Sequence, residues 1–408
     1  MKKIFTFLLA FYLLTSLSAQ QSDLSAEAWQ ADIQYLTEQV IKIHPNVFHQ
    51  VNAADFNAQA EALRKEVGNK DGNEIAAELM KLLTRIGDGN TRIDLKSLNW
   101  QKYPIRVQYF EDQLRVVATD SIYQRWLGLK VLKMGQYTLP ELQEKLLPLV
   151  PVNESSTHAK YLIQQYLCYP DLLIPLGIAG KRYAVIMFED EDDGRTKAPL
   201  LAKEEPKHWY KVQEDTPAHL VPPYDAIHPD LWLTHLADDQ VNFLYAKDYP
   251  SDKAAWKKLV KQLKKKFKQN PSSKVLIDLR ENESGNFSAG KQLIKLVSKS
   301  SGIKRGGQIY VAIGRQTYAA ATLDALQWRE KYGAILVGET TGANPNGYRE
   351  NTPVTLPNSG IQVFVPTKEY YQTLDNHVGG LKPDQNILMD WEGYKKGIDV
   401  VLEWVLKQ

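Results

Sequence analysis

From about residue 240 onward, strand-like and helix-like segments alternate, and this alternation restricts the possible folds more than any other feature. The segments VNFLYAK, KVLIDLR, QIYVAIG and AILVGE are apolar and rich in β-branched residues, and a helical pattern separates each from the next. Strands joined through helices pair in parallel within one sheet. We therefore predict an α/β fold with a mainly parallel sheet, and we expect ligands at the carboxyl ends of its strands.

The chain before this alternation has a different character, and 408 residues are enough for two or three domains. Residues 20–95 repeat apolar residues at helical spacing, which predicts a helical amino-terminal region. Residues 96–238 mix strand-like runs with an amphipathic helix, LPELQEKLLPLV, which predicts a mixed α+β middle region. Residues 239–408 form the predicted core, with a hairpin at VTLPNSGIQVFVPT and one closing helix at WEGYKKGIDVVLEWVLK.

The first 19 residues, MKKIFTFLLAFYLLTSLSA, have the pattern of a secretory signal peptide. The apolar run is shorter than the roughly 20 residues that a membrane span needs, so we expect cleavage before Gln20 and no stable span afterwards. No Cys follows the apolar run, which argues against a lipid anchor. The predicted location is the periplasm or the cell exterior. The lone Cys168 excludes an internal disulfide, and its apolar setting indicates a buried structural thiol.

The charge pattern argues against a nucleic-acid partner, because the formal net charge is only +2. A predicted helix at 252–268 nevertheless carries eight lysines, at positions 253, 257, 258, 261, 264, 265, 266 and 268. Such a helix could contact a polyanion or a membrane surface. A solvated face of a helix packed on the sheet is the interpretation that we favour here.

Five motifs in this order, IGDGNT, IDLRENESGN, GRQTYAAA, LVGETTGANPN and LKPDQNI, together resemble the tail-specific, or carboxyl-terminal processing, serine peptidase family. The resemblance spans roughly residues 25–400. It implies a core related to the crotonase and Clp folds, and a peptide or protein tail as the partner. We expect no cofactor, because the sequence contains no Walker-type loop or dinucleotide-binding fingerprint.

The residues at the motif positions do not supply the chemistry of this family. Ala319 stands where the resemblance places the nucleophilic serine, and a methyl group cannot attack a carbonyl. Asn90 stands at the position of a histidine base, and Asn344 stands at that of a lysine base. The resemblance assigns oxyanion donation to the N–H groups of Gly285 and Ala320.

Three functions are compatible with this pattern. We favour a catalytically inactive protein that binds peptides or protein tails in the former active-site groove, where no catalytic residue is intact. One alternative is an active serine-type peptidase with a relocated nucleophile, for which Ser284 would attack and His377 would act as base. Another is a structural envelope protein that uses the fold as a scaffold. We expect no metal site, because the histidines lack metal-ligand spacing.

Overall fold

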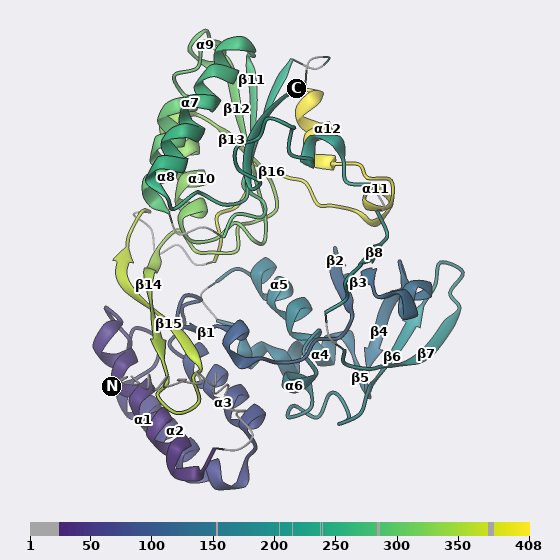
Figure 1. The fold of residues 1–408 in the computed structure, drawn as a ribbon, viewed down its shortest axis with the longest axis vertical. Coiled ribbons are helices and arrows are strands. Elements are labelled where there is room, and N and C mark those ends of the chain that lie inside the picture. The colour runs from purple at the N-terminus through teal and green to yellow at the C-terminus, as the bar shows by residue number, and fades with distance from the viewer. Residues whose placement is uncertain are drawn as a thin grey trace, which may run out of the picture.

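The computed structural model describes residues 24–408 except 152, 153, 204, 214, 237, 239, 284, 285 and 374–378. The predicted signal peptide lies outside the described residues, as do Ser284, Gly285 and His377. The described residues form a mixed α/β structure with three sheets (Figure 1). No helix among them is both long and apolar enough to cross a membrane.

The core contains a six-stranded sheet, in which neighbours from β16 to β10 pair in parallel and β9 pairs antiparallel with β10. In spatial order the strands are β16 (Gln385–Asn386), β13 (Ile335–Gly338), β12 (Gln308–Ile313), β11 (Lys274–Asp278), β10 (Val241–Ala246) and β9 (Leu231–Leu236). The other two sheets contain only antiparallel pairs among the described strands.

Helices cover both faces of this sheet, which explains the continuous apolar runs of its strands. On β11, Val275 and Ile277 pack in one core with α7 (Lys253–Gln269), α8 (Phe287–Val297) and α10 (Ala319–Tyr332). Leu276 points to the other face and packs with α12 (Val400–Leu406). The short helix α9 (Ser301–Lys304) follows α8.

The predicted closing helix is wrong in one respect, because the structure divides it in two. Helix α11 (Trp391–Lys395) ends before Gly397, and α12 begins after it. Gly397 has φ +68°, a left-handed conformation that glycine adopts readily and that interrupts a right-handed helix.

The amino-terminal helices α1 (Ala26–Ile43), α2 (Ala53–Glu66) and α3 (Gly72–Thr84) pack together beside a long hairpin that reaches down from the core (Figure 1). The hairpin consists of β14 (Gly347–Thr355) and β15 (Gln362–Tyr370), as its sequence predicts, and β1 (Arg92–Ile93) adds a third strand. Buried Asp32 of α1 accepts the backbone N–H groups of Asn358 and Ser359 at 2.9 and 2.7 Å. This carboxylate fixes the tip of the hairpin to the amino-terminal helices.

The middle region is built on a second antiparallel sheet with helices packed against it. Its strands are β2 (Ile105–Phe110), β3 (Gln113–Thr119), β4 (Lys130–Met134), β5 (Tyr137–Thr138), β6 (Ala184–Glu189), β7 (Arg195–Leu200) and β8 (Tyr210–Lys211). Its helices are α4 (Leu139–Leu146), α5 (Ser156–Tyr166) and α6 (Pro170–Leu173). Cys168 belongs to this region and is half-buried, and its Sγ is 3.5 Å from the carbonyl oxygen of Ile105.

Candidate functional site

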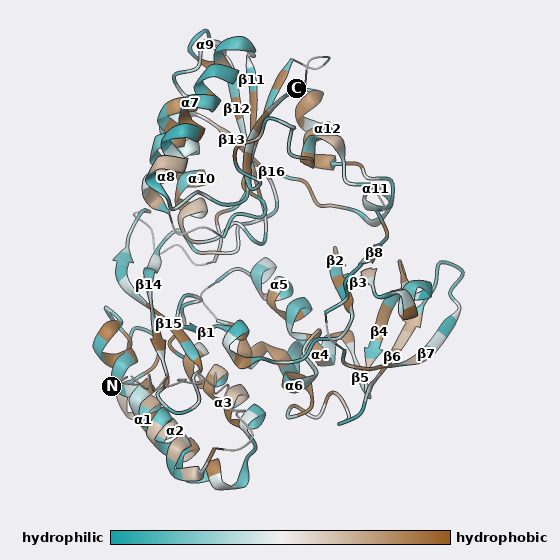
Figure 2. Ribbon diagram, in the orientation of Figure 1, coloured by the Kyte–Doolittle hydropathy of each residue, from teal (hydrophilic) through white to brown (hydrophobic). Residues whose placement is uncertain are grey.

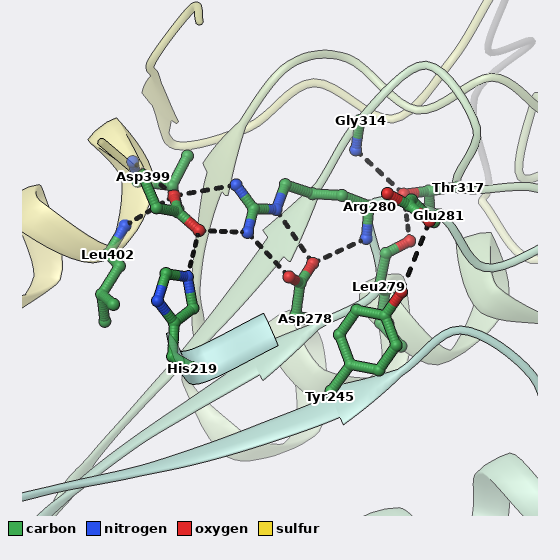
Figure 3. Close-up of polar contacts among 11 residues, drawn as sticks. His219, Tyr245, Asp278, Leu279, Arg280, Glu281, Gly314, Thr317, Asp399 and Leu402 are labelled. Carbon is green, nitrogen blue, oxygen red and sulfur yellow. Dashed lines mark hydrogen bonds and ion pairs between the residues drawn. The ribbon is translucent and has the colours of Figure 1, made fainter. Parts of the chain in front are cut away.

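A tight turn leads from β12 into α10, and Ala319 is the first residue of that helix. The Thr317 hydroxyl fixes the turn, because it donates to the Leu279 carbonyl at 2.7 Å and accepts the Gly314 N–H at 2.9 Å (Figure 3). Ala319 has φ +44°, which L-residues other than glycine adopt at a cost. Strained backbone of this kind persists only where its surroundings enforce it, and it often marks functional sites.

Ala319 lines a cavity of about 1100 Å³ that the three regions of the chain enclose together. The core contributes Ala319 and Phe287, and the middle region contributes His158 and Tyr161. Asn90 lies in the wall supplied by the loop after α3. The structure therefore brings the nucleophile position and one base position to the same cavity, although they are far apart in the sequence.

Glu154 joins three of the motif segments beside this cavity. Its carboxylate accepts hydrogen bonds from the Tyr318 hydroxyl at 2.8 Å, the Gly89 N–H at 3.0 Å and the Asn344 N–H at 2.9 Å. Burial raises the pKa of Glu154 above its ordinary value, although these donors act in the opposite direction. No sequence pattern indicated this role, because Glu154 lies in the middle region outside every motif.

Both the nitrogen and the oxygen of the Asn90 side-chain amide make hydrogen bonds within the cavity wall. The amide nitrogen donates to the Tyr348 carbonyl at 2.8 Å, and the amide oxygen accepts from the side chain of Asn351 at 3.2 Å. Asp88 holds the same loop, because it accepts the backbone N–H groups of Asn90 and Thr91. Asn90 thus links a loop to the hairpin, and its amide is no proton acceptor for catalysis.

Asn344, the other base position, does not line the large cavity. It lines an adjacent hollow of about 230 Å³, together with Asn90, Glu154 and Arg349. The residues named for the base therefore lie on two neighbouring cavities, with Asn90 in the wall between them.

His158 is a titratable residue in the large cavity that the sequence analysis did not select. Its ring stacks on Tyr318 with centroids 4.7 Å apart, and Nδ1 lies 3.3 Å from the Arg315 carbonyl oxygen. A carbonyl can only accept, so Nδ1 carries the proton of the neutral ring. Burial lowers the pKa of His158 to about 4, so this imidazole is neutral at neutral pH.

Arg349 lies in the wall shared by both cavities and is only 2% exposed. One terminal nitrogen donates to the Asn344 carbonyl, whereas Nε and Nη1 have no hydrogen-bond partner among the described residues. Burial lowers the pKa of Arg349, and the nearby Glu154 only partly offsets this effect. No sequence pattern distinguished Arg349, because a hairpin strand usually presents arginine to solvent.

The IDLR segment contributes a different cluster, which Figure 3 shows at the carboxyl end of β11. Arg280 binds both carboxylate oxygens of Asp278 at 2.9 and 2.7 Å and those of Asp399 at 2.9 and 2.5 Å. His219 adds a 3.0 Å contact to Asp399, which also caps α12. This cluster fastens the sheet to the closing helix, and none of its members lines the large cavity.

The remaining candidate residues stand as follows. Ala320 is fully buried at the second position of α10, and its predicted oxyanion role stays a prediction. Gly285, the other predicted oxyanion donor, lies outside the described residues. So do Ser284 and His377, the alternative nucleophile and base. His44 contacts Asp88 at 3.0 Å, so this histidine, like His219, bonds to an aspartate.

Comparison with known proteins identifies the fold. No family profile matches the sequence, and no curated protein matches it. Among solved structures, mature CPAF superposes with a TM-score of 0.61 and 11% identity over 93% of this chain and 96% of that one.

The chain shares the CPAF fold.

A structure of mature CPAF complexed with lactacystin agrees, with a TM-score of 0.60 and 11% identity over 93% of this chain and 98% of that one. The photosystem II D1 C-terminal processing protease also matches, with 14% identity over 93% of this chain and 96% of that one. Its TM-score of 0.42 is too low to support an argument. At such low identities the likeness to CPAF establishes the fold alone.

Proposed function

We propose that this chain is an exported, catalytically inactive relative of the tail-specific serine peptidases that binds peptides or protein tails in the cavity beside Ala319. The observation that carries the proposal is the presence of Ala319 and Asn90 on one cavity of about 1100 Å³. These are the positions at which the motif resemblance places the nucleophile and the base. Neither side chain has a group that can perform the step.

The loss of catalysis follows from the chemistry of acyl transfer. A serine peptidase needs a hydroxyl within hydrogen-bond reach of a base that removes its proton. His158 offers a neutral imidazole in the same cavity, but the Ala319 methyl has no proton to give and no lone pair to attack with. Oxyanion donors alone would leave only a small residual rate.

The capacity to bind does not depend on the missing groups. The cavity volume lies near the upper end of ordinary ligand pockets, which hold roughly 300–1,000 Å³. Its wall contains Arg349, whose Nε–H and Nη1–H have no partner among the described residues. A peptide supplies carbonyl and carboxylate oxygens that accept such hydrogen bonds, so a peptide ligand suits this wall.

One incubation tests the proposal. The chain from Gln20 onward is mixed with a diverse peptide library, and mass spectrometry compares the free pool with the peptides that stay bound. We expect uncut peptides to be enriched on the protein. Ser288→Trp, which places an indole at the cavity, should reduce retention, whereas Ser251→Trp, at an exposed position away from this cavity, should not.

The other outcomes favour the alternatives. New cleavage products, absent from a mock purification and lost in Ser284→Ala or His377→Ala, would support a relocated nucleophile. No retained peptide, together with a stable protein partner in crosslinking, would support the scaffold role. Ala319→Ser should restore little cleavage, because Asn90 and Asn344 offer no base and burial lowers the pKa of His158 to about 4, which makes its imidazole a weak base.

A further inference from the structure

The outer face of helices α7 and α8 combines two stretches of chain that lack acidic residues. No Asp or Glu occurs between Asp252 and Asp278, and none occurs between Glu283 and Asp324. Helix α7 belongs to the first stretch, and α8 and α9 belong to the second. The helices pack side by side on one face of the core sheet, at the end of the molecule remote from the amino-terminal helices (Figure 1). The two stretches therefore form one surface, which we call the basic face.

The basic face consists of exposed cations without carboxylate partners. The apolar residues of α7 are buried against the sheet, so its lysines form the outer surface. The ribbon of α7 accordingly carries mostly the hydrophilic colour in Figure 2. Among the described residues, only Lys266 of α7 makes an ion pair, with Asp225 at 2.7 Å. The exposed cations without such a pair are Lys253, Lys257, Lys258, Lys261, Lys264, Lys265, Lys268, Lys291, Lys295, Lys299, Lys304 and Arg305.

This charge is concentrated locally rather than spread over the molecule. The formal net charge of the whole chain is only +2, so the remainder of the surface must carry an excess of acidic groups. Exposed like charges repel one another across a helix face, and folding gains nothing from gathering them. An external anionic surface would offset that repulsion.

A groove of about 600 Å³ runs between α7 and α8 within the basic face. Apolar side chains of Val260, Phe267 and Leu296 line it. Four exposed lysines also line it, two from each side: Lys264 and Lys268, and Lys295 and Lys299. Ammonium groups around an apolar hollow match a phospholipid, whose phosphate is anionic and whose upper acyl carbons are apolar.

We propose that the basic face docks the protein on a membrane surface that contains anionic phospholipids. Proteins that bind single-stranded nucleic acid without sequence preference place aromatic side chains among the cations, so that bases can stack. No large apolar or aromatic side chain on α7, α8 or α9 is exposed, which favours headgroups over bases as the partner. The proposal concerns a surface outside the cavity, so it holds or fails independently of peptide binding.

Vesicle cosedimentation tests the proposal with the chain from Gln20 onward, which contains every described residue and lacks the basic, apolar segment 1–19. Each lysine near an anionic membrane strengthens binding by about fivefold. We expect binding to phosphatidylcholine vesicles that contain phosphatidylglycerol and none to phosphatidylcholine alone. Raising the salt from about 0.1 M to about 1 M should release the protein, because the screening length falls from roughly 10 to 3 Å.

Two variants with the same change in net charge separate the basic face from charge in general. K264Q/K268Q/K295Q/K299Q should weaken vesicle binding at least about tenfold. K42Q/K181Q/K197Q/K207Q, which changes exposed lysines elsewhere that make no ion pair among the described residues, should bind like the unmodified chain. Equal binding by both variants, or equal sedimentation with neutral vesicles, overturns the proposal. Binding to DNA or polyphosphate without binding to vesicles also overturns it, because the partner is then a soluble polyanion.

Discussion

Two arginines with little solvent exposure, Arg280 and Arg349, differ in their hydrogen-bond partners. Arg280 is 21% exposed at its side chain and makes hydrogen bonds to both oxygens of two aspartates. Arg349 is 2% exposed, and two of its nitrogens have no partner among the described residues. A cation whose partners all come from the fold has a structural role. The unpaired donors of Arg349 in a cavity wall mark it as a candidate ligand contact.

The pKa values of the two side chains follow the same contrast. Burial alone would lower the pKa of Arg280, but Asp278 and Asp399 raise it well above its ordinary value. At Arg349, burial dominates and the pKa falls, since Glu154 compensates only in part. Removing each side chain should therefore have different consequences for stability and for binding.

Arg280→Gln should produce the largest loss of stability. The substitution leaves Asp278 and Asp399 without their cation, and breaking a buried pair costs about 3–5 kcal/mol. Urea denaturation with linear extrapolation measures the free energy of unfolding. Arg305→Gln, at an exposed and unpaired position, is the control and should change it by less than about 0.5 kcal/mol. A loss below about 1 kcal/mol for Arg280→Gln would mean that the cluster does not hold α12 to the sheet.

Two buried aspartates extend the comparison to anions. Burial alone would raise the pKa of Asp399, but Arg280 and His219 lower it far below its ordinary value. Among the described residues, Asp324 in α10 accepts one hydrogen bond, from the Tyr249 hydroxyl at 3.0 Å, and burial raises its pKa to about 7. Asp399 therefore stabilises the fold above the pKa of the unfolded chain, near 4, and this contribution is lost as the pH falls. Asp324 has the opposite effect on stability, because a raised pKa in the folded state destabilises the fold as the pH rises.

Asp324→Asn should remove a pH-dependent destabilisation. In the unmodified chain the unfolded state releases this proton near pH 4 and the folded state only near pH 7, so stability falls between these values. The amide cannot ionise and still accepts from Tyr249. We expect the variant to gain roughly 2–4 kcal/mol relative to the unmodified chain between pH 4 and pH 8. Urea titrations at both pH values measure it, and a difference that does not change with pH would contradict the assignment.

Arg349→Met should have a small effect on stability and a larger effect on binding. Burial removes the guanidinium from water, and its few hydrogen bonds do not fully offset that cost. An apolar replacement should therefore change the free energy of unfolding by no more than about 1 kcal/mol. Peptide retention should fall about tenfold or more, because hydrogen bonds to charged groups contribute about 1.5–3 kcal/mol. Arg349→Lys keeps the charge and should retain part of the binding. A stability loss as large as that of Arg280→Gln would show that Arg349 also has a structural role.

The sequence predicted those parts of the fold that local periodicity determines. Apolar runs of β-branched residues identified the parallel strands, and the turn residues at 357–360 identified the hairpin. The resemblance assigned Asn90 and Ala319 to base and nucleophile positions, and both residues line one cavity. The prediction of one closing helix was wrong, because Gly397 interrupts an otherwise continuous helical pattern.

The sequence did not reveal Glu154, His158 or Arg349, for a physical reason. Each belongs to a region outside the nucleophile turn and reaches the site only when three regions pack together. Glu154 is distinguished by three donors from distant segments, and His158 by stacking on Tyr318. Such roles are created by tertiary contacts, and no local spacing encodes them.

Ala319→Gly should produce the smallest effect, and it separates retained geometry from lost chemistry. A left-handed conformation costs an alanine about 1–2 kcal/mol, and glycine avoids that cost but loses more entropy on folding. We expect a net gain of about 0.5–1 kcal/mol in the free energy of unfolding. Ala320→Gly, one residue further and not among the positions with positive φ, should instead lose about 1 kcal/mol. If both variants lose stability equally, the turn is not strained. If only Ala319→Gly gains, the backbone keeps a conformation suited to presenting a nucleophile although the side chain no longer supplies one.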